Sequence, residues 1–134
     1  MGSVTILKYH LELTTRHQKS ALQGIEQSVY KAFRQVEEVS DFRILDMKIT
    51  DGNQIHLAIK MSPRYSVSSM VNRIKGLSQH YLWHEEEAHL KQFYWGSKKK
   101  LWKGSFFCST LGDVSEKTVL RYIEKQNGPG EEKI

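Results

Sequence analysis

Two short segments hold side chains whose types and spacing could do chemistry. Gln54 and His56 are two residues apart in an alternating, strand-like stretch, so they project from the same face of that strand. Tyr122 and Gln126 are four residues apart in a helical stretch near the carboxyl end, so they share one stripe of that helix. If this helix docks on that sheet face, a phenol meets an imidazole and two carboxamides, which suits a nucleophile beside a divalent-metal site.

Each of these side chains also has a purely structural interpretation. A tyrosine on an amphipathic helix is most often a packing residue, and a single histidine on a strand is most often a surface or hydrogen-bonded residue. Val119, Leu120 and Ile123 already form an apolar side of the helix, which leaves Tyr122 and Gln126 on an adjacent side. The spacing alone leaves both interpretations open.

Hydrophobic periodicity predicts the elements that would position these residues. Strands are expected at residues 5–14, 42–50, 54–61 and 105–110, and helices at residues 20–39, from Ser66 onward and after Ser115. Ser20 is the predicted N-cap of the first helix, and Asp51-Gly52 is a strong hairpin-turn signal. Residues 78–103 are harder to interpret and suggest a short helix followed by a long loop.

This order predicts an α+β fold, a ferredoxin-like β-α-β-β-α-β sandwich with an antiparallel sheet and an added C-terminal helix. The first and third strands are central neighbours in that topology. Leu11 and Leu13 would then face the core, and His10 and Glu12 would share the opposite face with His56. On the second strand, Leu45, Met47 and Ile49 are expected on one side. We expect one domain over residues 4–127 and a flexible tail over residues 128–134.

Several segments, taken in order, carry a family resemblance. They are Tyr9-His10, residues 14–17, residues 53–57, residues 62–66, residues 73–76, Leu101-Trp102, residues 105–112 and residues 122–126. Together they resemble the TnpA-type single-tyrosine HUH transposases of small bacterial and archaeal insertion sequences, the IS200-like family. The chain departs from this pattern at Gln54, which stands where the first histidine of the family motif normally lies.

The resemblance implies that Tyr122 is the nucleophile. It would attack a phosphodiester of single-stranded DNA, form a 5′-phosphotyrosine and free a 3′-hydroxyl, so that rejoining needs no ATP. The resemblance also implies that His56 and Gln126 hold a divalent metal. Gln54 could add a carbonyl oxygen, a ligand that suits Mg²⁺ or Mn²⁺, and His10 is a possible extra ligand.

The same resemblance implies recognition of DNA hairpins near the ends of the element. It further implies a homodimer in which the tyrosine helix of one subunit docks against the metal pair of the other. Gln54 makes an alternative credible, namely a catalytically weakened or inactive hairpin-binding protein derived from such a transposase. An RNA-binding domain on the same kind of sheet is a third hypothesis, but the third strand lacks the stacking aromatics that it would need.

Composition agrees with a nucleic-acid partner. The 134 residues carry a net charge of +5 and have a pI near 9.3. The densest basic and aromatic stretch contains Lys98, Lys99, Lys100 and Lys103 with Trp95 and Trp102, and Arg64, Arg73 and Lys75 add charge near the second helix. Such a mixture suits phosphate contacts and base stacking, although charge runs are often only solvated loops.

Other functions are disfavoured. His84 and His89 are five residues apart and so do not match the H-E-x-x-H motif of zinc proteases. The single Cys108 excludes an internal disulfide framework and reads as a small apolar strand residue. No stretch resembles a signal peptide or a membrane span, so a cytoplasmic protein without a membrane partner is expected.

Overall fold

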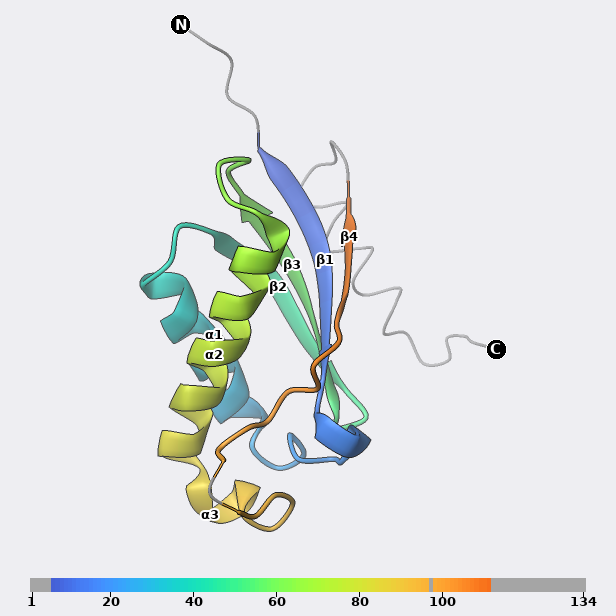
Figure 1. The fold of residues 1–134 in the computed structure, drawn as a ribbon, viewed down its shortest axis with the longest axis vertical. Coiled ribbons are helices and arrows are strands. Elements are labelled where there is room, and N and C mark those ends of the chain that lie inside the picture. The colour runs from blue at the N-terminus through green and yellow to red at the C-terminus, as the bar shows by residue number, and fades with distance from the viewer. Residues whose placement is uncertain (1–5, 97, 112–134) are drawn as a thin grey trace, which may run out of the picture.

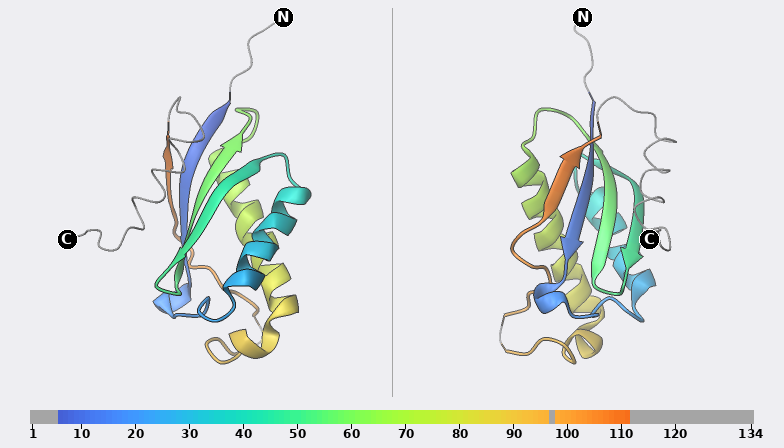
Figure 2. Two further views of the ribbon diagram at one scale, coloured as in Figure 1. Left: turned by 180° about the vertical axis from the view of Figure 1, so that it is seen from behind. Right: turned by 90° about the vertical axis from the view of Figure 1, so that its right-hand side faces the viewer.

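The computed structural model describes residues 6–96 and 98–111. A four-stranded sheet is backed on one face by two long helices (Figure 1), and the views in Figure 2 show both helices on the same side. The strands are β1 (Leu7–Thr14), β2 (Arg43–Thr50), β3 (Gln54–Met61) and β4 (Phe107–Thr110). The helices are α1 (Glu26–Glu38), α2 (Val67–Glu85) and the short α3 (Glu87–Leu90), with a 3-10 turn at Arg16–Gln18.

The sheet is antiparallel, with the strand order β2-β3-β1-β4. This is the predicted ferredoxin-like arrangement, and β1 and β3 are its central neighbours as expected. Their register places Glu12 opposite His56 and Thr14 opposite Gln54. The predicted C-terminal helix and tail lie outside the described residues.

The core lies between the sheet and the two helices. Leu11, Leu57 and Ile59 are fully buried on the sheet, and Phe33 and Ile74 are fully buried on α1 and α2. Strict alternation along β1 and β3 puts these leucines and isoleucines on one face. The intervening residues therefore share the opposite face, where the candidate site lies.

The first helix begins later than predicted, at Glu26 instead of near Ser20. Gly24 has φ +91°, a left-handed conformation that a continuous right-handed helix does not allow. The residues before it instead form turns that pack on the β2–β3 hairpin, where the Leu22 amide donates to the Gly52 carbonyl at 2.8 Å. The N-cap prediction for Ser20 is therefore wrong.

Strand β2 departs from simple alternation. The pairing with β3 shifts between Ile44 and Asp46, which is a bulge. As a result Ile44 is buried, while Leu45 is only partly buried. The prediction that Leu45 shares a side with Met47 and Ile49 fails because the bulge inserts one residue into the pattern.

Helix α2 is longer than the sequence suggested. The Ser66 hydroxyl accepts from the Ser69 amide at its start, and the helix then runs without a break to Glu85. Leu82 and Trp83 are buried in its last turns. No helix among the described residues is long and apolar enough to cross a membrane.

The hairpin turn at Asp51-Gly52 is as predicted. Asp51 and Gly52 have φ of +55° and +67°, which is the geometry of a type I′ turn. A Cβ at position 52 would lie 2.9 Å from the Gln23 Cβ, so both the backbone and the packing require glycine. This turn holds Gln54 and Thr50 next to each other.

Replacing Gly52 with alanine should destabilise the protein by about 1–3 kcal/mol, because the new methyl group adds a clash to an unfavourable φ. The matched control is Gly76→Ala inside α2, where nothing lies within 4 Å of an added Cβ. That change should stabilise the helix by up to about 1 kcal/mol. Urea unfolding measures the change in the free energy of unfolding, which should have opposite signs in the two variants. Equal changes would contradict the requirement for glycine at position 52.

Candidate metal and nuclease site

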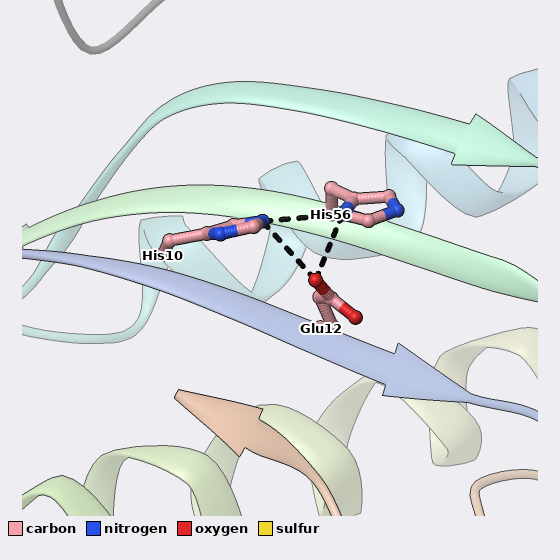
Figure 3. Close-up of side chains that lie close together, drawn as sticks. All are labelled: His10, Glu12 and His56. Atoms are coloured by element: carbon pink, nitrogen blue, oxygen red, sulfur yellow. Dashed lines mark hydrogen bonds and ion pairs between the residues drawn. The ribbon is translucent and has the colours of Figure 1, made fainter. Parts of the chain in front are cut away.

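Three side chains that could ligate a metal meet on the sheet face opposite α1 and α2. His10 and Glu12 come from β1 and His56 comes from β3 (Figure 3). Their potential ligand atoms all lie within 4.8 Å of one another, and no other group of three or more His, Cys, Asp or Glu does so in residues 6–96 and 98–111. The antiparallel register of two central strands builds this cluster.

The distances within the cluster are short. The two rings are 3.1 Å apart between His10 Nε2 and His56 Nδ1. One Glu12 carboxylate oxygen, Oε2, lies 3.7 Å from the first atom and 3.6 Å from the second. Three ligand atoms thus form a nearly equilateral triangle.

Both imidazoles are withdrawn from solvent. His10 is 1 % exposed and His56 is 5 % exposed, with the rings stacked at a centroid distance of 5.3 Å and the Phe107 ring against the edge of His10. Burial lowers the pKa of His10, and burial together with neighbouring His10 lowers the pKa of His56 to about 4. Both rings are therefore neutral near pH 7, which is the protonation state that binds metals.

Glu12 is less enclosed than the histidines. Its side chain is 22 % exposed, and burial raises the pKa of its carboxyl group. A cation bound beside it would act in the opposite direction and favour the carboxylate. Glu12 therefore supplies the negative charge that two neutral imidazoles lack.

Gln54 lies at the other edge of His56. Its side-chain carbonyl oxygen is 3.1 Å from His56 Nε2 and also accepts from the Thr50 hydroxyl at 3.3 Å. Its amide donates to the Thr14 hydroxyl at 3.2 Å. Because a carbonyl oxygen only accepts, this network assigns the proton of His56 to Nε2 and leaves the lone pair on Nδ1, toward His10 and Glu12.

The sequence-predicted site residues are only partly brought together. His56, Gln54 and the possible extra ligand His10 form one hydrogen-bonded cluster. Tyr122 and Gln126 lie outside the described residues. Glu12 was not among the predicted site residues, although the alternation of β1 had placed it on the same face as His10.

The predicted DNA-binding residues do not form one patch. Arg73 bonds to the Val39 carbonyl and the Ser40 hydroxyl, and Lys75 bonds to the Gly104 carbonyl at 3.0 Å. Lys99 pairs with Glu87 at 3.2 Å. Arg64 precedes α2, at the opposite end of that helix from the loop with Lys98 and Lys100.

One basic hollow lies near the end of β1, the strand that carries His10 and Glu12. Arg16, His17, Gln18, Lys103 and Gly104 line it, where the chain leaves β1. The Lys103 amide donates to the Thr14 carbonyl at 2.8 Å, so the hollow is tied to the end of the strand that also carries Glu12. Sequence reasoning had singled out Lys103 and had not included Arg16.

Trp95 and Trp102 differ in their surroundings. Trp95 is 77 % exposed, and the Lys19 ammonium lies 5.0 Å from its ring centre. Trp102 is buried and donates to the Ser78 hydroxyl at 2.9 Å. Only Trp95 therefore offers a free ring face for base stacking.

The residues present fit a divalent metal. Ligand atoms of one ion with bonds of about 2.0–2.2 Å are separated by roughly 3.0–3.6 Å, which is close to the observed triangle. Two neutral imidazoles and a carboxylate are also a common ligand set for divalent transition metals.

The chain belongs to the IS200-like transposase family, whose sequence pattern matches residues 3–126. It is 28 % identical over 120 residues to the transposases for insertion sequence element IS200 of Salmonella typhimurium and Salmonella typhi, a match that covers 89 % of this chain and 76 % of each relative. The class of enzyme is thus a DNA transposase.

Solved structures share the fold. A Deinococcus radiodurans protein with a provisional transposase assignment superposes with a TM-score of 0.72 at 23 % identity, covering 96 % of this chain and 97 % of that one. A REP-associated tyrosine transposase bound to a REP hairpin gives a TM-score of 0.59 at 14 % identity, covering 92 % and 67 %.

The buried His56 predicts an acid-sensitive fold. Its folded pKa of about 4 lies below the ordinary 6.5, so the unfolded chain binds more protons between these values and stability falls as pH drops through this window. From pH 7 to 5 this amounts to about 2 kcal/mol, which the raised pKa of Glu12 partly offsets.

Urea unfolding at pH 7 and 5 tests this effect. His56→Gln should lose less stability on acidification than the wild type, because glutamine does not titrate. Asn72→Gln on the exposed side of α2 gives the control, since it replaces one uncharged amide by another and should keep the wild-type dependence. Identical pH dependence in all three proteins would contradict the role of His56.

Proposed function

We propose that this protein cleaves and rejoins single-stranded DNA at the ends of an insertion sequence, using Tyr122 as nucleophile and a divalent cation, Mg²⁺ or Mn²⁺. The observation that supports this most is the cluster of His10, Glu12 and His56, whose potential ligand atoms lie within 4.8 Å of one another. His56 and Gln126 are the ligands that the family pattern implies, and Gln54, which stands in place of a histidine, and His10 are further candidates. The reaction would take place on DNA in the cytoplasm.

The chemistry follows from what each residue can do. The Tyr122 phenol loses its proton and attacks the phosphorus, the bond to the 3′ oxygen breaks, and that oxygen takes up a proton. The product is a 5′-phosphotyrosine and a free 3′-hydroxyl, which can later reverse the reaction. The bound cation would stabilise negative charge on the phosphate oxygens. Gln54 and His10 contact the two ring nitrogens of His56 at 3.1 Å each.

The substrate in this proposal carries a hairpin, and the enzyme is a homodimer with active sites shared between subunits. The REP-associated relative was solved with a REP hairpin, which supports the hairpin as a ligand. In a shared arrangement the tyrosine helix of one chain would complete the cluster of the other. No membrane takes part.

The hollow at Arg16 and Lys103 is the proposed path for the DNA backbone next to the scissile phosphate. The Thr14 hydroxyl bonds Gln54 in the cluster, and Arg16 follows two residues later. Trp95 and the lysines 98–100 extend the basic and aromatic surface toward α3. Arg64, Arg73 and Lys75 are proposed as DNA contacts separate from this hollow, because Arg64 lies at the other end of α2.

A second candidate is a weakened or inactive hairpin-binding protein of transposase origin. Gln54 favours it, because a neutral carboxamide is a weaker ligand than imidazole for transition metals. Such a protein would bind hairpin DNA and form no covalent product.

Covalent trapping separates the two candidates. Incubating the protein with Mn²⁺ and a hairpin oligonucleotide carrying a single-stranded flank should give a protein–DNA adduct that survives denaturing electrophoresis. Tyr122→Phe should abolish the adduct and keep hairpin binding within about twofold. An adduct that persists in Tyr122→Phe would refute the nucleophile, and hairpin binding without any adduct would favour the second candidate.

Neutralising the hollow should weaken DNA binding in a salt-dependent way. Arg16→Gln and Lys103→Gln should each lower the slope of log K against log [salt] by about 0.7–1, because each removes one phosphate contact. Lys31→Gln on exposed α1 is the matched control. Unchanged slopes in the two test variants, measured by fluorescence anisotropy, would remove the hollow from the interface.

A further inference from the structure

His56 presents its two ring nitrogens to different partners. Nε2 faces the Gln54 carbonyl oxygen at 3.1 Å, while Nδ1 faces His10 at 3.1 Å and Glu12 at 3.6 Å. A carbonyl oxygen beside a ring N–H is the arrangement that fixes the tautomer of many metal-binding histidines. The free lone pair of His56 therefore lies on the side of β1, away from Gln54.

We propose that His10 Nε2, Glu12 Oε2 and His56 Nδ1 are the protein ligands of the cation, and that Gln54 is a positioning residue which holds His56 from behind. This inference rests on the proposed use of a divalent ion at this site and changes which residues bind it. The histidine missing from position 54 is replaced by two residues of the neighbouring strand.

The separations favour this assignment. The three ligand atoms are 3.1, 3.6 and 3.7 Å apart, which is close to the roughly 3.0–3.6 Å expected for adjacent ligands on one ion. The His10 and His56 nitrogens already share one proton, and an ion would displace it to the other nitrogen of His10 or to solvent. The Gln54 amide group, in contrast, is fully engaged with Thr14, Thr50 and His56.

The ligand types also predict which metal binds. Two imidazoles with one carboxylate suit Mn²⁺, Co²⁺ or Zn²⁺, whereas Mg²⁺ prefers an all-oxygen environment. Three protein ligands leave coordination positions for a phosphate oxygen of DNA. The site is therefore expected to bind Mn²⁺ and Co²⁺ more tightly than Mg²⁺, by at least tenfold.

Metal binding without DNA tests the assignment. Titration calorimetry with Mn²⁺ and the visible absorption of Co²⁺ report the site without any need for activity. Glu12→Gln and His10→Gln should each weaken Mn²⁺ binding by at least tenfold and change the Co²⁺ spectrum. Gln54→Ala should weaken binding about tenfold, as outer partners do, and leave a Co²⁺ spectrum close to that of the wild type.

Matched variants control the interpretation. Glu38→Gln removes an exposed carboxylate on α1 and should leave metal binding unchanged. Circular dichroism and thermal unfolding of each variant ensure that only folded proteins are compared. Gln54→His tests the role of position 54 directly. If this position supplied a ligand, the stronger imidazole ligand would tighten Mn²⁺ binding. In the proposed site we expect no tightening.

Three results would overturn the proposal. They are wild-type affinity for Mn²⁺ in folded Glu12→Gln, tighter binding in Gln54→His, and absence of Mn²⁺ and Co²⁺ binding by the wild type. The transposase proposal fails separately, through the covalent-trapping experiment. Metal binding that depends on Glu12 in a protein that forms no adduct would support the site and refute the cleavage activity.

Discussion

The antiparallel pairing of β1 with β3 is the constraint on which the rest of the structure depends. Its register sets Glu12 opposite His56 on one face of the sheet. The neighbouring pair, Leu11 and Leu57, is buried on the other face against the helices. A shift of one residue would turn both sets of side chains over, so the core would become polar and the site apolar. The hydrophobic core therefore fixes the geometry of the site, and no loop is needed to form it.

The buried cluster of His10, Glu12 and His56 costs folding free energy, because it withdraws ionisable groups from water. Burying two imidazoles beside a half-buried carboxylate lowers the pKa of both histidines and raises that of Glu12. A purely structural sheet would place apolar side chains there and gain stability. Strained electrostatics of this kind concentrate at functional sites, which agrees with membership of a transposase family.

The sequence predicted what depends on local pattern. Alternation located β1 and β3, Asp51-Gly52 identified the hairpin, and the order of elements gave the ferredoxin-like sheet. The late start of α1 at Glu26 and the bulge after Ile44 were missed, because neither the positive φ of Gly24 nor an inserted strand residue changes the hydrophobic periodicity enough to be read from it. The place of Glu12 in the cluster was missed because a cross-strand partner becomes visible only when the register is known.

The distances within a sheet explain why a metal site can be built from two paired strands instead of from one strand. Residues two apart on one strand are separated by about 6.6 Å along the chain, whereas directly opposed residues on paired strands are about 4.5–5.5 Å apart. The backbone of residue 56 is thus expected to lie nearer to that of residue 12, its cross-strand partner, than to that of residue 54, although the Gln54 side chain still reaches His56 Nε2 at 3.1 Å. An ion held in the proposed way would join β1 to β3, so that metal binding would stabilise the strand pair that creates the site.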